Sequence, residues 1–283
     1  MAVLYVVATP IGNLQDISFR ALDTLKKVKY IACEDTRQAK KLLNFYGIED
    51  KHLISYHEHN EEEASEKILK ILEKEDVALV SDAGTPCISD PGYRVVKKAR
   101  ENNIKVVPIP GPFAGAVALS ASGLPSDKFL FLGFLPQKRS HKEKVLKKYI
   151  ELDATLILYE SPNRVMDTVN LIKDLDEKAN IVVAKELTKI HEEFIIGNPF
   201  EILDFFEKSP DKIKGEFVIL VHPSEKKATI DEDEIKRRVI ELKNQNLKSK
   251  EIAKIIADEY KLPKNQAYKI VLESGNEGWE MLW

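Results

Sequence analysis

Short apolar runs rich in β-branched residues alternate with amphipathic helical patterns from residue 3 to residue 221 of this 283-residue chain. Apolar runs of this kind, bounded by turn residues, are typical of buried strands. Strands that alternate with helices indicate an α/β fold whose sheets contain parallel pairs. We predict strands at residues 3–8, 30–33, 77–81, 104–109, 129–134, 155–159, 181–184 and 216–221.

Signals for helix starts lie between several of these strands. Thr36 is typical of a helix cap, and Asn60 and Glu63 have the spacing of a capping box. Asp90 followed by Pro91 predicts an N-cap and a first helical residue. Further helices are expected at about 140–151, 162–174 and 199–207.

Two clusters of breaking or polar residues divide the chain, at residues 122–125 and 223–227. We therefore expect an N-terminal α/β lobe over residues 1–122, a C-terminal α/β lobe over 123–224 and a helical extension over 225–283. The extension carries three short helical patterns joined by tight links, a pattern that resembles a helix-turn-helix unit.

The composition excludes several classes of protein. Hydrophobic residues make up 43% and charged residues 31%, which excludes intrinsic disorder as the main state. No apolar run reaches the roughly 18 residues of a membrane span, and the apolar N-terminus has only the length of a strand. Two cysteines, Cys33 and Cys87, cannot form a disulfide framework, so we expect a cytoplasmic protein. Their spacing from His57 and His59 does not support a metal site, and no metal is expected.

Loops rich in Gly, Pro and Asp follow three of the predicted strands, at residues 9–13, 81–92 and 108–115. Glycine lets the backbone approach a ligand closely, and proline stiffens a loop before the ligand arrives. Ligands of α/β sheets bind where strands end, so these loops predict a ligand crevice. They carry few cations and no phosphate-binding glycine motif, which favours a neutral or cationic ligand.

Carboxylates also gather where predicted strands end. Glu34 and Asp35 follow one strand, Glu160 follows another, and Lys185 and Glu186 follow a third. These groups indicate a polar substrate cleft. Two other interpretations stay open, namely acids that favour a helix N-terminus and a buried structural network.

Two segments are basic although the formal net charge of the chain is -3. Residues 138–148 contain six Lys or Arg against one Glu, and residues 235–270 contain ten against four acidic residues. Each segment alone is compatible with a solvated helix face. Together they favour contact with a phosphate backbone.

Beyond these patterns, the strand-end motifs resemble those of the tetrapyrrole (corrin/porphyrin) methylase superfamily. Within it they are similar to the branch of ribosomal RNA small-subunit (cytidine-2'-O)-methyltransferases. The segment 82–86 distinguishes that branch from the porphyrinogen enzymes. The resemblance is carried by residues 4–14, 33–37, 55–60, 80–86, 89–92, 108–112, 122–125, 133–136, 159–162 and 186–189.

This resemblance implies a two-lobed α/β methyltransferase, unlike the common Rossmann type, with S-adenosylmethionine folded between the lobes. It also implies a homodimer that methylates a ribose 2'-hydroxyl of a cytidine in the decoding region of 16S ribosomal RNA. The substrate is expected to be the assembled small subunit, with neither DNA nor a membrane as partner. The hypothesised chemistry is direct in-line transfer, in which a side chain takes the hydroxyl proton.

The resemblance also implies roles for individual residues. The cofactor shell implied by the family consists of Pro10, Asp82, Ala83, Gly84, Thr85, Ile88, Pro112, Phe113, Ala114, Tyr159 and Leu187. The candidate proton acceptors are Glu34, Asp35, Glu160, Glu186 and Lys185. The candidate RNA contacts are Arg37, Lys138, Arg139, Lys142, Asn163 and Arg164.

Two alternatives remain at this point. One is a tetrapyrrole or diphthamide-type methylase on the same fold. The other is a non-catalytic ribosome-assembly module that binds RNA.

Overall fold

The computed structural model describes residues 2–224, 232–245, 247–260 and 262–274. The chain divides into two compact units, Met1–Ser224 and Glu225–Trp283, which are treated separately below. Within the described residues, no helix has both the length and the apolar character needed to cross a membrane.

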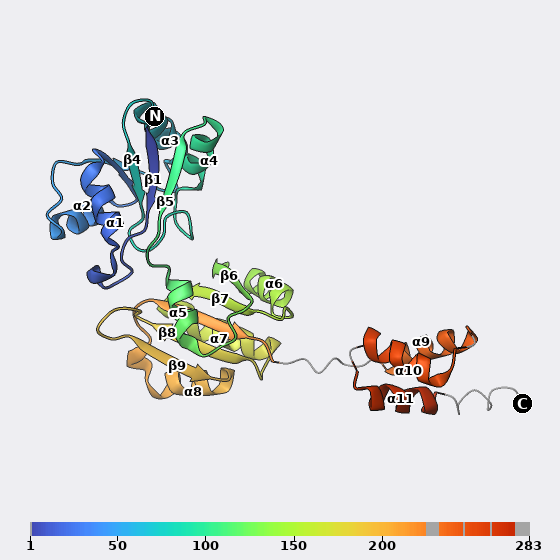
Figure 1. The fold of residues 1–283 in the computed structure, drawn as a ribbon. Helices are drawn as coiled ribbons and strands as arrows, with labels where there is room; N and C mark the ends of the chain where they lie inside the picture. The colour runs from blue at the N-terminus through green and yellow to red at the C-terminus, as the bar shows by residue number, and fades with distance from the viewer. Residues whose placement is uncertain (1, 225–231, 246, 261, 275–283) are drawn as a thin grey trace, which may run out of the picture. The chain divides into compact units, whose positions relative to one another are not determined.

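The first sheet of the larger unit consists of five parallel strands in the order β3-β2-β4-β1-β5. Its strands are β1 (Val3–Val7), β2 (Tyr30–Cys33), β3 (His52–Ser55), β4 (Val77–Val80) and β5 (Lys105–Ile109). The helices that cover one face are α1 (Phe19–Lys27) and α2 (Thr36–Phe45), and those that cover the other are α3 (Glu61–Leu72) and α4 (Tyr93–Glu101) (Figure 1). Because all five strands run the same way, the loops that follow them meet at one edge of the sheet.

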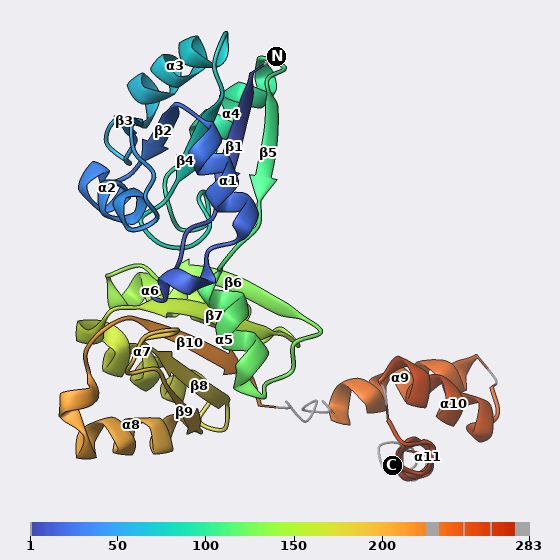
Figure 2. The same cartoon turned by 60° about the vertical axis from the view of Figure 1, so that its left-hand side comes forward.

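The second sheet of this unit is mixed, in the order β6-β7-β10-β8-β9. Its strands are β6 (Phe129–Phe134), β7 (Thr155–Glu160), β8 (Asn180–Lys185), β9 (Glu193–Gly197) and β10 (Phe217–His222). Only β6 and β7 pair in parallel, and the other neighbours are antiparallel. The helix on one face is α5 (Ala114–Ser122), and the helices on the other are α6 (Arg139–Tyr149), α7 (Pro162–Leu175) and α8 (Pro199–Lys208) (Figure 2). The predicted α/β class is therefore confirmed.

Apolar residues on both faces of each sheet hold this unit together. Leu146 of α6, Val165 of α7 and Ile202 of α8 are completely buried against the second sheet. Burial of a side chain of this size contributes about 2 kcal/mol. On the opposite face Leu119 of α5 packs in one cluster with Leu187, a residue of a loop that borders the site.

The smaller unit is a bundle of three short helices, α9 (Glu232–Asn244), α10 (Ser249–Glu259) and α11 (Lys264–Glu273). Its core is shared by Val239, Ile252, Ile256 and Val271, which are at most 1% exposed. The predicted helical character of this segment is confirmed over its described residues.

Two helix caps differ from those predicted. Helix α2 has Asp35 as its N-cap, so the prediction that Thr36 caps this helix is wrong by one residue. Helix α4 begins at Tyr93 with Gly92 as its N-cap, so the prediction that Asp90 caps this helix is wrong. The Gly92 N–H instead donates to the carboxylate of Glu61 at 3.1 Å. Asn60 is the N-cap of α3, as predicted, but its side chain makes no capping hydrogen bond, because its Oδ1 accepts the His57 N–H at 2.8 Å.

Candidate functional site

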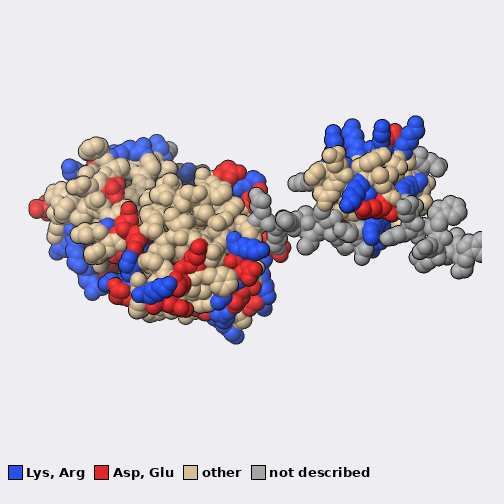
Figure 3. Space-filling view, turned by 90° about the horizontal axis from the view of Figure 1, so that it is seen from below, with Lys and Arg blue, Asp and Glu red and all other residues tan. Residues whose placement is uncertain are grey.

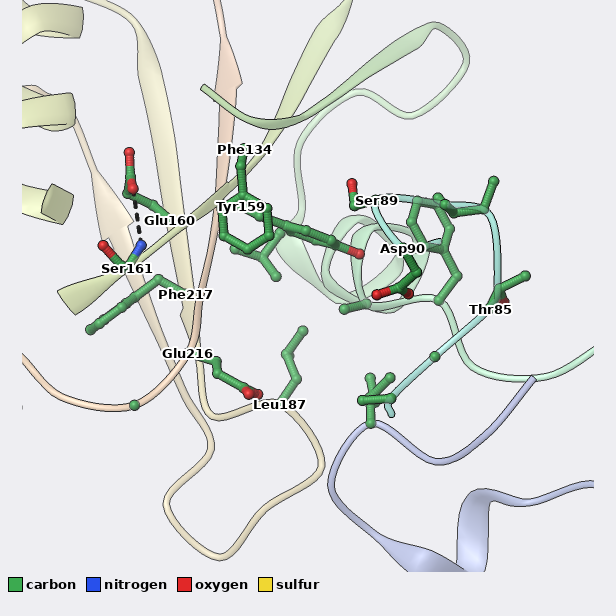
Figure 4. Close-up of a pocket in the computed structure, with 18 of the residues that line it drawn as sticks. Thr85, Ser89, Asp90, Phe134, Tyr159, Glu160, Ser161, Leu187, Glu216 and Phe217 are labelled. Atoms are coloured by element: carbon green, nitrogen blue, oxygen red, sulfur yellow. Dashed lines mark hydrogen bonds between the residues drawn. The ribbon is translucent and has the colours of Figure 1, made fainter. Parts of the chain in front are cut away.

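A cavity of about 360 Å³ lies where the loops after β1, β4 and β5 meet the edge of the second sheet (Figure 4). Ligand sites of small molecules are commonly of this size or larger. The loop after β4 contributes more of the wall than any other segment. The lining residues are Ile11, Ala83, Gly84, Thr85, Ile88, Ser89, Asp90, Phe113, Ala114, Phe134, Tyr159, Glu160, Ser161, Pro162, Leu187, Gly215, Glu216, Phe217 and Val218.

Hydrogen bonds between the three loops hold this wall in place. Thr9 and Gly84 exchange two backbone hydrogen bonds, at 2.8 and 3.0 Å. The Thr85 hydroxyl donates to the carbonyl of Pro112 at 2.9 Å, which joins the loop after β4 to the loop after β5. A Cβ on Gly111 would lie 2.8 Å from the Cβ of Ala8, so only glycine permits this close approach. A wall that is already ordered loses less entropy when a ligand binds.

The wall is aromatic and acidic. The rings of Phe113, Phe131, Tyr159 and Phe134 form a chain of edge contacts with centroids 5.0 to 5.5 Å apart. Of the described residues that line the cavity, none is a lysine or an arginine. Aromatic faces and carboxylates attract a cation in a site of low polarity. The cavity therefore suits a partly apolar ligand that carries positive charge.

Asp90 is the lining residue whose acidity departs furthest from its ordinary value. Burial raises the pKa of its carboxyl to about 7, and the charges of Glu34 and Asp82 add to the effect, while a hydrogen bond with Ser81 opposes it. Sequence reasoning missed Asp90 because the Asp-Pro pair is so typical of a helix cap. Its place in a Gly- and Pro-rich loop after a strand was the signal that could have found it.

Glu160 lines the cavity with its backbone, but its carboxylate points away from it (Figure 4). That carboxylate is 1% exposed. It accepts the Thr168 hydroxyl at 2.6 Å and the Ser161 N–H at 3.0 Å, and the Lys142 ammonium lies 3.7 Å away. Of the interpretations left open by the sequence, a buried structural network is therefore the one that applies to Glu160, whose carboxylate is not open to a substrate.

Lys142 was predicted to contact RNA, and its burial in the structure shows that this prediction is wrong. Its side chain is 1% exposed, and its ammonium donates to Asp167 and Thr168 at 2.9 Å each. An ammonium enclosed in this way does not reach a phosphate at the surface. Lys142 instead attaches α6 to α7 from inside the protein.

The other predicted proton acceptors do not line the cavity. Asp35 caps α2, and the hydrogen bonds it accepts from the Arg37 side chain and backbone lower the pKa of its carboxyl to about 2. Burial raises the pKa of Glu186, but hydrogen bonds from the Glu216 N–H and from Lys189 outweigh burial and leave it lowered. Lys185 is 4% exposed at the end of β8. Burial and the charge of Asp82 raise the pKa of Glu34.

The predicted cofactor shell coincides with the cavity over most of its members. The members that line it are Ala83, Gly84, Thr85, Ile88, Phe113, Ala114, Tyr159 and Leu187. Pro10, Asp82 and Pro112 sit one residue outside the lining set; Asp82 accepts the Asp35 N–H at 3.1 Å. Sequence reasoning left Phe134 and residues 215–218 out of the shell. The signals that could have found them are the motif at residues 133–136, which contains Phe134, and the glycine at position 215.

The remaining candidate RNA contacts lie at the start of α6 and α7 and after β2. Lys138, Asn163 and Arg37 are exposed. Arg139 pairs with Asp167 at 2.6 Å and with Asp174 at 3.0 Å. The guanidinium of Arg164 donates to the carbonyl of Leu135 at 2.7 Å. Among the residues that the structure describes, no three His, Cys, Asp or Glu side chains are grouped so that they could hold a metal ion.

Comparisons with known proteins agree with this geometry. Residues 3–203 match the model of the family described as Tetrapyrrole (Corrin/Porphyrin) Methylases. A protein of Pasteurella multocida named "Ribosomal RNA small subunit methyltransferase I" is 41% identical over 276 residues, which cover 97% of this chain and 98% of that protein. A protein of the same name from Hydrogenobaculum is 48% identical over 220 residues, which cover 77% of this chain and 94% of that protein.

Among solved structures, a diphthine synthase superposes with a TM-score of 0.64 at 15% identity, covering 78% of this chain and 90% of the other. At that identity the superposition supports the fold alone. The family model and the relatives together confirm the resemblance read from the strand-end motifs. The chain belongs to the tetrapyrrole (corrin/porphyrin) methylase family.

Proposed function

We propose that this chain transfers a methyl group from S-adenosylmethionine to the ribose 2'-hydroxyl of a cytidine in the decoding region of 16S ribosomal RNA. The names of relatives that align with nearly the whole chain support ribosomal RNA of the small subunit as the substrate. The observation that carries the proposal is the cavity itself, which is built from the family's strand-end loops and has a cation-free wall.

The residues of the cavity fit S-adenosylmethionine. When bound, this cofactor supplies an electrophilic methyl group on a positively charged sulfur. The aromatic rings of Phe113 and Tyr159 suit such a cation. Ala83 and Gly84 also line the cavity, where the lack of a large side chain leaves room for the ligand. The full shell inferred from the sequence, including Pro10, Asp82 and Pro112, remains part of the proposal.

In this account the protein acts mainly by positioning. The ordered loops fix the bound molecule, and the ring chain from Phe113 to Phe134 keeps water from one side of it. Holding two reactants in a reactive geometry supplies a large part of the rate gain of such a reaction. Direct in-line transfer needs no covalent intermediate on the protein, only a group that takes the hydroxyl proton.

The proposal includes exposed basic residues as contacts to RNA. Lys138, Asn163 and Arg37 offer exposed polar side chains in the larger unit. In the smaller unit, lysine and arginine side chains gather along the upper side of the face seen in Figure 3. Phosphate contacts of this type supply affinity that falls as salt rises.

The proposal also covers the organisation and setting of the protein. We propose that the protein is a homodimer in the cytoplasm. It acts on the RNA of the assembled small subunit and does not act on DNA. The proposed parts are residues 1–122 and 123–224 for the two lobes of the cofactor site and 225–283 for the helical extension, with α5, the last helix of the first range, packed on the second sheet.

The substrate is tested with methyl-labelled S-adenosylmethionine and three acceptors. These are small ribosomal subunits from a strain that lacks this chain, naked 16S RNA, and large subunits. We expect label in the small subunits at a rate at least tenfold above that for either other acceptor. Equal labelling of large and small subunits would contradict the proposal.

The cavity is tested by Gly84→Val. Gly84 has φ 87°, and a Cβ there would lie 3.4 Å from Ile11 and 3.7 Å from the carbonyl of Pro112, so a branched side chain intrudes on the wall. We expect at least tenfold weaker binding of S-adenosylmethionine by calorimetry, which corresponds to about 1.4 kcal/mol. The matched control is Gly47→Val, because Gly47 also has a left-handed φ of 63° but its Cβ would meet no atom within 4 Å. The control should lose stability and keep its affinity for the cofactor, and equal affinity in both variants would place the cofactor elsewhere.

A further inference from the structure

Asp90 presents a carboxylate to the cavity at a point where no other part of the proposed function uses one. Figure 4 shows its side chain directed into the space between the loop after β4 and Tyr159. The helix that follows starts three residues later, at Tyr93, with Gly92 as its N-cap and no side-chain capping hydrogen bond. The carboxylate is therefore not engaged in capping a helix.

The local backbone is built to hold Asp90 in this place. Cys87, Ser89 and Gly92 have φ values of 72°, 62° and 141°, so three residues within six adopt conformations that L side chains rarely take. For Cys87 and Ser89, which are not glycines, such conformations cost about 1–3 kcal/mol each and persist where the surroundings enforce them. Here Glu61 accepts the Gly92 N–H at 3.1 Å, and the Tyr56 hydroxyl accepts the Val95 N–H at 3.2 Å. These bonds fix the start of α4 and so fix the turn that carries Asp90.

The groups that face Asp90 come from three segments, one of which is its own loop after β4. Glu34 follows β2, Asp82 and Ser81 follow β4, Tyr159 lies on β7, and Cys87 belongs to the same loop. Burial raises the pKa of Tyr159 to about 12 and that of Cys87 to about 11, so both keep their protons at neutral pH.

The other carboxylates of the wall have partners of their own. Glu160 is enclosed with Thr168, Ser161 and Lys142. Glu216 pairs with Lys189 at 3.0 Å and is 76% exposed. Asp90 is thus the half-buried carboxylate of the described cavity wall that remains open toward the space a ligand would fill.

We propose that Asp90 is the proton acceptor for the ribose hydroxyl that attacks in this cavity, an inference that rests on the function proposed above. As the hydroxyl oxygen bonds to the methyl carbon, the carbon–sulfur bond breaks and its electron pair stays on sulfur. The O–H bond also breaks, its electron pair stays on oxygen, and the proton passes to an Oδ of Asp90. Asp90 returns that proton to water once the products have left.

A pKa of about 7 matches this task at neutral pH. A general base acts best when its pKa lies near the working pH, because it is then both ionised in part and able to hold the proton. The rate of methyl transfer should rise with pH up to about 7 and then level off. Glu34, Asp82, Tyr159 and Cys87 face the same group, so the profile belongs to Asp90 only if its replacement removes the rise.

The test compares Asp90→Asn, Asp90→Glu and the control Asp23→Asn, in which an exposed carboxylate of α1 is replaced. Asp90→Asn should slow methylation of small subunits about 100-fold or more, the usual size of a general-base contribution. It should also remove the rise of rate with pH, while the affinity for S-adenosylmethionine by calorimetry stays within fivefold. Asp90→Glu should recover part of the rate with a pH rise, and Asp23→Asn should match the wild type.

The protonation of Asp90 can also be followed through protein stability, without an activity assay. The folded-state pKa of Asp90 lies above its ordinary value, so the folded state holds a proton that the unfolded chain loses first. Its stabilising effect is complete below pH 3.8 and is lost as pH rises to about 7. The unfolding free energy of Asp90→Asn relative to wild type should therefore increase across this range.

Three results would overturn the inference. They are a methylation rate in Asp90→Asn within threefold of wild type, a pH rise that survives the replacement, and a cofactor affinity that falls more than fiftyfold, which would make Asp90 a binding group. Failure of the function proposed above looks different, because wild type and Asp23→Asn would then also leave small subunits unlabelled.

Discussion

Replacing Lys142 by methionine should lower the free energy of unfolding by about 3 kcal/mol, the usual cost of removing one partner from a buried ion pair. Lys142 and the carboxylate of Glu160 are each 1% exposed and lie 3.7 Å apart. Without the ammonium, Glu160 keeps a buried charge with less compensation, and Asp167 and Thr168 lose a donor. Urea unfolding measures the change.

Lys147→Met is the matched control on the same helix. Lys147 is 60% exposed and pairs with Glu143 one turn away, so its loss should change stability by about 0.5 kcal/mol or less. Glu160 still has the guanidinium of Arg164 at 3.0 Å after Lys142→Met, so adding Glu160→Gln should recover only part of the loss. Equal stability of Lys142→Met and Lys147→Met would show that the buried cluster contributes nothing.

Replacing Gly92 by alanine should cost about 3 kcal/mol of stability and abolish methyl transfer, since its φ of 141° is one that other residues avoid. A Cβ there would also lie 2.6 Å from the Cys87 Sγ and 2.9 Å from Leu79. Relief of that contact must move the turn that carries Asp90. Thermal unfolding measures the loss of stability, and the methylation assay measures the loss of methyl transfer.

Gly123→Ala serves as the control for this change. Gly123 ends α5 at φ 75°, and its Cβ would meet no atom within 4 Å, so only the backbone cost of about 1 kcal/mol is expected. Cys87→Ala should recover part of the stability of Gly92→Ala, because it removes the nearest atom. Equal stability of Gly92→Ala and Gly123→Ala would show that a Cβ at position 92 causes no steric conflict with Cys87 and Leu79.

The α/β architecture was predictable because apolar runs and helix periods are local signals. The two strands that were not predicted, β3 and β9, are both edge strands, with one buried residue each, Ile54 and Ile195. A strand that buries so little leaves a weak pattern in the sequence. Their places are set by pairing with β2 and β8, which is information from distant parts of the chain.

The cavity wall was predictable where glycine and proline mark the loops, as at Gly84 and Thr85. The positions of two side chains, Asp90 and Lys142, could not be predicted. Asp90 has the sequence of a cap, and only the bond from Gly92 to Glu61, 31 residues away, shows that the cap lies elsewhere. Lys142 lies in a basic segment, and its burial depends on Asp167, 25 residues further on. Contacts between distant segments decide both cases, and a pattern along one segment does not contain them.

The central claim is that one cytidine of small-subunit RNA receives a methyl group on its ribose. The most direct measurement is mass spectrometry of nuclease digests of 16S RNA, taken from small subunits before and after incubation with the protein and S-adenosylmethionine. We expect one new 2'-O-methylated cytidine, located in the decoding region and absent with Gly84→Val. Methyl groups on a base, or on no nucleotide of the small subunit, would contradict it.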